Sequence, residues 1–238
     1  MVAVSPHLDW PDCRNVRDLG GLPTDDGGRI RPGALIRADS LHYLSPAGVD
    51  AVRRAGVSRV VDLRSPAEVA EAPTPFTSDD LGYAVPVQDP AVPGEGMDTI
   101  VAVCIDMLDR RPERFAEAVL AIAEAPPGAV VVHCHGGKDR TGMVVAIALS
   151  VAGVPVDEIV ADYFLTKQRL ASAMAEQLAA EPDESLHAEM LEFRDTRAES
   201  IVAILEHLDT AYGGPTNYLL HGGLTTAQLD VLRRRLTG

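Results

Sequence analysis

A run of small and β-branched residues, "GAVVVHC" at 128–134, is apolar on both faces of an extended chain. A strand of this kind must be covered on both sides, which is typical of a central strand in a parallel sheet. The run leads at once into "HGGKDR" and then into the apolar segment "TGMVVAIALSVAG" at 141–153, which predicts a helix. A buried strand, a glycine-containing loop and a helix therefore follow one another without interruption.

The rest of the chain alternates in the same way. We predict an α/β fold, with a mostly parallel central sheet flanked by helices on both sides, in one domain that spans residues 1–238. The block 155–212 is almost wholly helical and is expected to form a cap or insertion that acts as a lid. The other expected elements are short strands within 15–39, a helix from the Ser45 cap to Gly56, strands at 57–65 and 81–87, helices at 98–109 and 113–125, and one final short helix capped by Thr225 or Thr226.

Composition limits the possible partners. The chain has 238 residues and a net charge of −14, with 46% hydrophobic and 24% charged residues. These values indicate a packed core and argue against nucleic-acid binding, because phosphate backbones are held by excess Lys and Arg. No signal peptide and no apolar run of about 18 residues is visible, so we expect a cytoplasmic protein with no membrane span. Three cysteines do not suggest a disulfide scaffold, and the sequence leaves the oligomeric state open.

The loop after the buried strand has the composition of an anion site. Ligands bind at the carboxyl ends of parallel strands, where Gly136 and Gly137 allow backbone N–H groups to point inward. The positive end of the following helix faces the same point, and Arg140 adds a planar bidentate donor. This environment favours the thiolate form of Cys134, which becomes a nucleophile beneath a bound phosphoryl group. Thr141 either donates to the sulfur or caps the helix.

"HCHGGKDRTG" resembles the signature loop of cysteine-dependent protein tyrosine phosphatases. It is most similar to the bacterial tyrosine and phosphoinositide phosphatases of the mycobacterial PtpB type. "NVRDLGG" at 15–21, "LIRAD" at 35–39 and "VVDLRSPAEV" at 60–69 also resemble segments of that family, although Val16 stands where phenylalanine is usual. The resemblance covers most of 14–153. It implies hydrolysis of phosphotyrosine, and also of phosphoserine, phosphothreonine or phosphoinositide monoesters, beneath a helical lid, and its members can act in a host cell, so non-classical secretion stays open.

The resemblance implies catalytic roles for Cys134, Arg140 and Asp139. His135, Gly136, Gly137, Lys138 and Thr141 are expected to bind the substrate, with Lys138 as a second cation for substrates that carry more than one phosphoryl group. The general acid has two further candidates, Asp89 in "VQDP" and Asp62 in "VDLRS"; Asp62 could instead pair with Arg140 or Arg64.

Other interpretations of the loop compete with this one. His133 and His135 could ligate a metal, but no further metal-ligand spacing accompanies them, so neither a metal nor a cofactor is expected. "GGKD" is not a nucleotide-binding loop, because Asp139 follows the lysine where Ser or Thr is required. A phosphate-binding module without turnover and a sulfurtransferase remain as alternative functions. The full set of Cys134, Asp139, Arg140 and Thr141 favours the phosphatase.

Overall fold

The computed structural model describes residues 7–88 and 97–238. Its centre is a five-stranded sheet with the strand order β1-β2-β5-β3-β4. The strands are β1 (Arg17–Asp18), β2 (Ile36–Ala38), β3 (Val57–Asp62), β4 (Gly82–Ala84) and β5 (Ala129–His133). β1 is antiparallel to β2, and all the other neighbouring strands are parallel. The predicted α/β fold with a mostly parallel sheet is confirmed.

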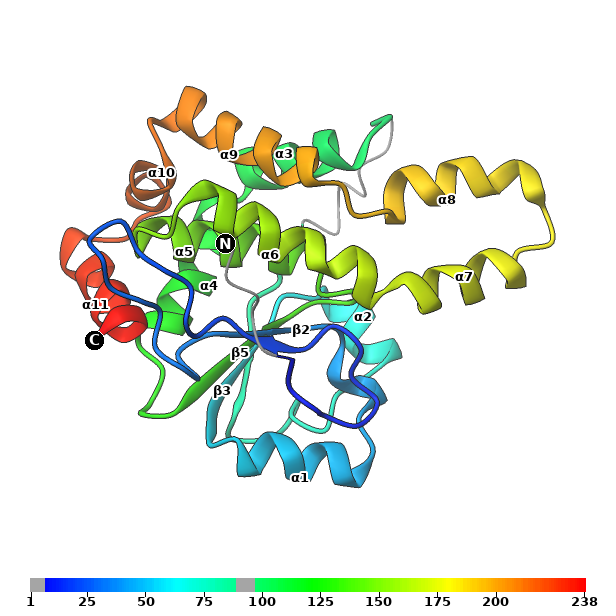
Figure 1. Cartoon of the computed structure of the whole chain (residues 1–238), viewed down its shortest axis with the longest axis horizontal. Helices are drawn as coiled ribbons and strands as arrows, with labels where there is room; N and C mark the ends of the chain where they lie inside the picture. The colour runs from blue at the N-terminus through cyan, green and yellow to red at the C-terminus, as the bar shows by residue number, and fades with distance from the viewer. Residues whose placement is uncertain (1–6, 89–96) are drawn as a thin grey trace.

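β5 lies in the middle of the sheet, and its side chains alternate between two cores. Val130 and Val132 belong to the larger core, which the C-terminal helices cover. Ala129 and Val131 point the other way, into a smaller core that includes Val52 of α1 (Pro46–Arg54). Figure 1 shows α1 on one face of the sheet and the other long helices on the opposite face. All five residues of β5 are buried, which explains why the strand is apolar on both faces.

Helices on the larger face form a layer around α5 (Asp139–Val151), of which ten residues are buried. α5 contacts α4 (Pro112–Ala123), α6 (Val156–Arg169) and α9 (Ala198–Tyr212). The remaining helices on this side are α3 (Ile100–Arg110), α10 (Pro215–His221) and α11 (Thr226–Thr237), and the short α2 (Pro66–Glu71) follows β3. No helix in the described part of the chain is long and apolar enough to cross a membrane.

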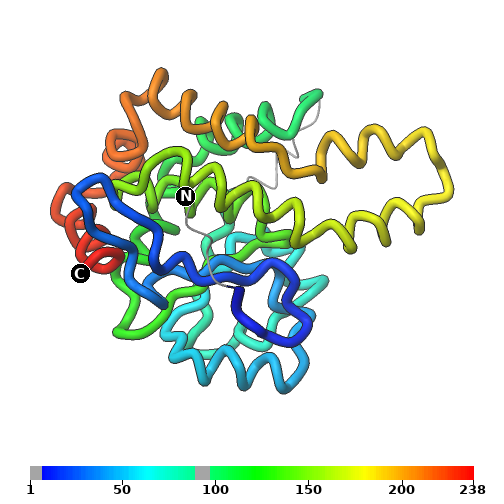
Figure 2. The backbone as a smooth tube through the Cα atoms, viewed as in Figure 1, coloured from blue at the N-terminus to red at the C-terminus, as the bar shows by residue number. Residues whose placement is uncertain are grey.

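The expected cap, 155–212, contains two different kinds of helix. α6 and α9 pack against α5 and bury apolar side chains such as Ile159 and Ile201. Between them, α7 (Ala171–Ala180), a 3-10 turn at Glu184–Leu186 and α8 (His187–Arg194) bury no residue at all. Figures 1 and 2 show these residues as a helical hairpin that projects from one side of the molecule. We refer to residues 171–194 as the hairpin.

The structure differs from the sequence prediction at two helix boundaries. The C-terminal segment contains two helices instead of one, because Gly213 with φ of +74° ends α9 and Pro215 then begins α10. α5 begins at Asp139 and not at Thr141, so the last loop residues form its first turn. Thr225 is the residue that caps α11.

Candidate active site

Residues 134–138 connect β5 to α5 at the carboxyl edge of the sheet. The Cys134 thiol lies at the base of a cavity of about 730 Å³ and is almost fully covered. His135, Gly136, Lys138, Asp139 and Arg140 line the same cavity. The structure therefore brings the predicted catalytic residues Cys134, Asp139 and Arg140 together at one place.

The loop is held by its carbonyl groups. Asn15 donates from its amide nitrogen to the carbonyl oxygens of Gly136 (3.0 Å) and Gly137 (3.2 Å), and Arg37 donates to Gly137 O at 2.7 Å. The Ser40 N–H donates to His135 O at 2.8 Å. With the carbonyls turned outward to the protein, the N–H groups of residues 135–139 have no acceptor among the described residues. This is the arrangement of a backbone anion cradle.

Gly137 makes this loop conformation possible. Its φ is +65°, and a Cβ at this position would lie 2.3 Å from the carbonyl oxygen of Ala38 in β2. Any other residue would be strained and would also push the loop off β2. Gly136 has no such conflict, because the nearest atom to a Cβ there is a methyl carbon of Leu170 at 3.8 Å.

Arg140 is fixed by a carboxylate from α2. Its two terminal nitrogens donate to the two oxygens of Glu68 at 2.6 and 2.8 Å. Glu68 is itself held by a capping box with Ser65 at the start of α2. Burial would raise the pKa of Glu68, but the hydrogen bonds and charge of Arg140 outweigh burial and lower it to about 2. Glu68 thus orients the guanidinium as a permanent partner, and the remaining N–H donors of Arg140 are left for a ligand.

The three candidate acids have different environments. Asp139 lies in the cavity wall with its side chain 23% exposed. Asp62 instead pairs with Arg64, whose Nη2 donates at 2.7 Å, and it does not line the cavity. Burial would raise the pKa of Asp62, but the hydrogen bonds and the charge of Arg64 lower it overall. Asp89 lies outside the described residues. Of the candidates that the structure describes, only Asp139 lines the same cavity as Cys134.

Two polar side chains at the ends of the loop, His133 and Thr141, are fully buried. The Nε2 of His133 lies 3.6 Å from Asp62 Oδ2, and burial lowers the pKa of His133, which favours the neutral ring. The Thr141 hydroxyl is fully buried and has no hydrogen-bond partner among the described residues. His133 is buried while His135 is exposed, so the two do not converge as metal ligands would. No group of three or more potential metal-ligating side chains occurs within residues 7–88 and 97–238.

Lys138 is buried in an unexpected way. Its ammonium donates to Asp139 Oδ1 at 2.8 Å and to the backbone oxygens of Phe193 (3.1 Å) and Asp195 (3.2 Å). These acceptors occupy every N–H donor of a lysine side chain. A direct contact between Lys138 and a substrate would require one of these bonds to be exchanged.

The sequence analysis did not identify the buried side chains that support the loop on the side away from the cavity. Asp162 of α6 accepts from Arg17 Nε and from Arg37 Nη1, both at 2.7 Å, and Arg17 donates to the Asn15 side chain at 2.6 Å. All of these side chains are buried. The segments "NVRDLGG" and "LIRAD" contain Asn15, Arg17 and Arg37. Arginines among apolar residues in these segments were the sequence signal for a buried polar network. Glu68 was likewise visible as the last member of "SPAE", a capping box.

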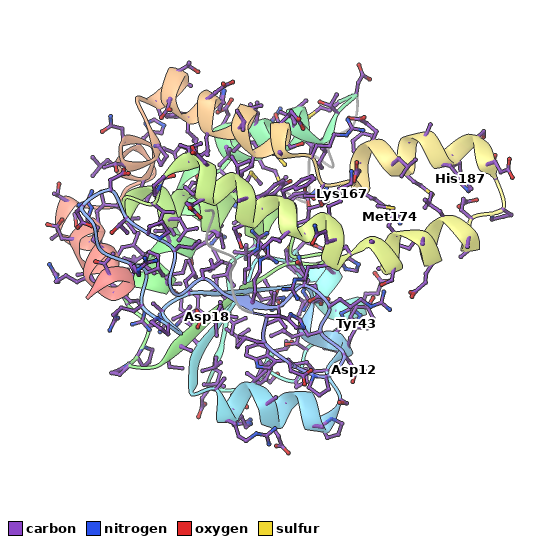
Figure 3. The ribbon with its side chains drawn as sticks, viewed as in Figure 1. Asp12, Asp18, Tyr43, Lys167, Met174 and His187 are labelled. Atoms are coloured by element: carbon purple, nitrogen blue, oxygen red, sulfur yellow. The ribbon has the colours of Figure 1, made fainter. Side chains whose placement is uncertain are left out.

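The hairpin closes the far side of the cavity. Ala173, Met174 and Phe193 of the hairpin, with Leu170 just before it, form an apolar wall of the cavity that Tyr43 and His135 also line. In Figure 3, Met174 lies between α7 and α8, whereas Tyr43 and Asp12 lie together below α7 in this view. The cavity thus has a polar base at the loop. Its upper part combines apolar side chains, which suit a flat aromatic group, with charged ones such as Arg14, Glu176 and Arg194.

A parallel sheet with an anion cradle at its carboxyl edge is the architecture of enzymes that act on phosphorylated ligands. The sequence profile of the tyrosine phosphatase family matches residues 8–238 of the chain. A protein of Cupriavidus necator, provisionally named a tyrosine-protein phosphatase, is 30% identical over 89% of this chain and 82% of its own length. The triple specificity protein phosphatase PtpB of Mycobacterium tuberculosis is 29% identical over 97% of this chain and 99% of its own. A tyrosine-protein phosphatase of Nostoc commune is 29% identical over 85% of this chain and 74% of its own length.

The chain belongs to the tyrosine phosphatase family. It is a hydrolase with protein tyrosine phosphatase activity, and its substrate carries a phosphoryl group.

Proposed function

We propose that the protein hydrolyses phosphotyrosine through a phosphocysteine intermediate formed on Cys134. The observation that carries this proposal is the covered thiol beneath free loop N–H groups and beside Arg140. The thiolate attacks phosphorus, a P–S bond forms and the ester P–O bond breaks. The loop N–H groups and Arg140 stabilise the equatorial oxygens while charge spreads over them.

Asp139 is the proposed general acid. It gives its proton to the departing phenoxide and then, as a carboxylate, takes a proton from the water that attacks phosphorus and breaks the P–S bond. The buried hydroxyl of Thr141 has no hydrogen-bond partner in the described structure. We assign to it a hydrogen bond that forms during the reaction, to the Cys134 sulfur, which leaves more readily when it accepts one. His135, Gly136 and Gly137 belong to the cradle that receives the phosphoryl oxygens.

The shape of the cavity supports an aryl ester as the preferred substrate. The phosphoryl group would lie on the loop, and the tyrosine ring would contact the apolar wall that the hairpin supplies. We also propose that phosphoinositides are accepted, since Arg14 and Arg194 line the opening and could meet a second phosphoryl group there. In this proposal the whole chain is one phosphatase domain, and the hairpin is the part of 155–212 that acts as its lid.

Activity against p-nitrophenyl phosphate in EDTA tests the thiolate mechanism. Cys134→Ser should abolish turnover and keep vanadate binding, and Arg140→Lys should be severely impaired because an ammonium cannot replace the bidentate donor. Trapping of a phosphoenzyme with radiolabelled substrate, absent in Cys134→Ser, tests the intermediate itself. Full turnover by Cys134→Ser would overturn the mechanism.

A substrate panel tests specificity. Phosphotyrosine peptides, phosphoserine peptides and phosphoinositides should be compared at equal concentration by phosphate release. Hydrolysis of the first and the third is expected. If the wild-type protein leaves phosphoinositides untouched, the enzyme is a tyrosine phosphatase without the lipid activity.

A further inference from the structure

The ammonium group of Lys138 joins three parts of the site. One donor goes to the neighbouring Asp139. The other two go to the backbone oxygens of Phe193, near the end of the hairpin, and of Asp195, which directly follows the hairpin. The lysine is 6% exposed, so these bonds are shielded from water. Buried bonds to a charged donor are stronger than their exposed counterparts.

The two backbone acceptors lie at the carboxyl end of α8. Phe193 belongs to its last turn, and Asp195 is its C-cap. Carbonyl groups there lack partners within the helix and carry partial negative charge, so a buried ammonium is a favourable cap. Other bonds between the hairpin region and the body are more exposed, such as Lys167 to the Asp195 carboxylate and Arg14 to Glu176. Because α7 and α8 bury no residue, Lys138 provides the shielded polar tie between the hairpin and the body.

The same ammonium orients the carboxyl group of Asp139. Lys138 holds Oδ1, while Oδ2 has no hydrogen-bond partner among the described residues. Oδ2 is therefore the oxygen that is free to carry the proton toward a leaving group. After the proton has left, the ammonium stabilises the resulting carboxylate, which is the form required to accept a proton from water.

We propose that Lys138 is a positioning residue that couples closure of the hairpin to the orientation of Asp139, an inference that rests on the proposed role of Asp139 as the acid. With the hairpin closed, the ammonium is fixed by two carbonyl groups and holds Asp139 in one direction. With the hairpin open, it loses both acceptors and the orientation of Asp139 is released. Proton donation is thereby restricted to a covered substrate, from which water is excluded.

Dependence on the leaving group tests the coupling to Asp139. Lys138→Met keeps the length of the side chain and removes the ammonium. Its kcat/KM should fall about 10-fold more for phenyl phosphate, a poor leaving group, than for p-nitrophenyl phosphate, as expected when part of a general-acid contribution is lost. Lys138→Gln should show the same pattern and serves if the methionine variant folds poorly. Lys167→Met is the matched control, because Lys167 binds Asp195 from α6 without touching Asp139; its two losses should be equal.

A double-mutant cycle distinguishes positioning of Asp139 by Lys138 from a direct contact between Lys138 and substrate. In an Asp139→Asn background, Lys138→Met should no longer change the ratio between the two aryl phosphates, because its effect passes through the carboxyl group. If instead Lys138→Met lowers phosphoinositide hydrolysis selectively and leaves the ratio unchanged, the lysine contacts substrate and the positioning role is wrong. Equal losses for both aryl phosphates would also overturn it.

Hydrogen exchange tests the tie to the hairpin without relying on catalysis. Lys138→Met should speed amide exchange in residues 171–194 and leave β5 and α9 unchanged. Unaltered exchange in the hairpin would overturn the coupling even if the kinetics change. Turnover by Cys134→Ser would defeat the proposed function separately, and the exchange result would still decide whether Lys138 holds the hairpin.

Discussion

Charged side chains in the cavity are mostly paired with a partner from another element. Arg140 binds Glu68, and Arg14 binds Glu176, with the closest atoms 2.6 and 3.1 Å apart. A chain with a net charge of −14 therefore does not attract phosphate by an excess of cations. The attraction must be local, from the free loop N–H groups, the first turn of α5 and the donors of Arg140 that Glu68 leaves free. Such a site is selective for a group that reaches its base.

Asp139→Asn tests the general acid directly. The amide cannot give a proton to the leaving group, so kcat/KM for phenyl phosphate should fall by about 10²-fold or more, while the loss for p-nitrophenyl phosphate should be much smaller. The basic limb of the pH–rate profile should also flatten. Asp157→Asn on the exposed start of α6 is the control. Equal losses for both substrates would give the role to another carboxyl group.

Glu68→Gln tests the orientation of Arg140. An amide offers one acceptor oxygen in place of two, so the guanidinium loses its fixed plane and kcat/KM should fall on the order of 10-fold. The control is Glu71→Gln at the end of α2, which is exposed and should behave as the wild type. Steady-state kinetics with p-nitrophenyl phosphate provide the measurement. Unchanged kinetics in Glu68→Gln would show that Arg140 does not need this partner.

The Glu68 pair also has a defined pH dependence. The pKa of Glu68 is about 2 in the folded protein against an ordinary value of 4.5, so the unfolded chain binds a proton more readily. The stability that the pair contributes is complete above pH 4.5 and is lost as the pH falls toward 2. The difference between the urea midpoints of the wild type and Glu68→Gln should therefore be constant at pH 6 to 7, begin to shrink below about pH 4.5, and vanish only as the pH approaches about 2. A constant difference down to the acid limit would contradict this assignment.

At the scale of elements, the cavity lies between buried elements at its base and the hairpin, which has no buried residue, on one side. β5 and α5, which flank the loop, are buried along most of their length. The hairpin has no buried residue and contributes side chains to the cavity only along its inner side. Regions with few buried contacts open at low free-energy cost, so the hairpin is the part of the site that is expected to move.

Replacement of residues 172–191 by a short Gly/Ser linker tests whether the hairpin lies outside the structural core. The ends of the segment are close in space, because Lys167 on one side contacts Asp195 on the other at 3.0 Å. Since no core is lost, the Tm should change by less than about 4 °C, which corresponds to about 1 kcal/mol. KM for p-nitrophenyl phosphate should rise on the order of 10-fold because the cavity loses the apolar side chains of Ala173 and Met174. Cooperative unfolding at a much lower temperature would show that the hairpin is part of the core.

At the scale of the whole molecule, a buried ion network connects the sheet, the loop and the helical layer. Asp162 of α6 is bound by Arg17 of β1 and Arg37 of β2, and Arg37 in turn holds the loop at Gly137. Burial and the charge of Arg37 lower the pKa of Arg17 to about 10. Burial would raise the pKa of Asp162, but the charges of both arginines keep it below its usual range. The catalytic loop is thus supported by the packing of α6 on the sheet.

Asp162→Asn should destabilise the whole fold. It leaves two buried arginines without a carboxylate, a loss that typically costs about 3–5 kcal/mol. Chemical denaturation should show this change, and the remaining folded protein should bind vanadate more weakly because Arg37 no longer fixes the loop. Asp157→Asn on the same helix should stay within about 1 kcal/mol of the wild type. A stable Asp162→Asn protein would mean that the arginines find other partners.

Sequence alone was sufficient for the features that depend on neighbours along the chain. The two-faced apolar run predicted β5, proline after a serine cap predicted α1, and the loop with its cysteine and arginine predicted the anion site. Such features are specified locally, by side-chain periodicity, capping and glycine conformation. The segments around Asn15 and Arg37 resembled a phosphatase family, but their sequence did not say what these residues contact.

The tertiary structure alone decided which charges pair. Glu68 reaches Arg140 across 72 residues, Arg17 reaches Asp162 across 145, and Lys138 reaches Phe193 across 55. Each cation had several acidic or carbonyl groups available in the sequence, and only the packing of α2, α6 and α8 around the loop selects one. Residue types and spacing thus predicted that Cys134 and Arg140 lie together at a glycine-containing loop, and the structure places both in one cavity. The partners of Arg140, Asp139 and the hairpin depend on distances that exist only in the folded molecule, because charge interactions weaken with separation and with exposure to water.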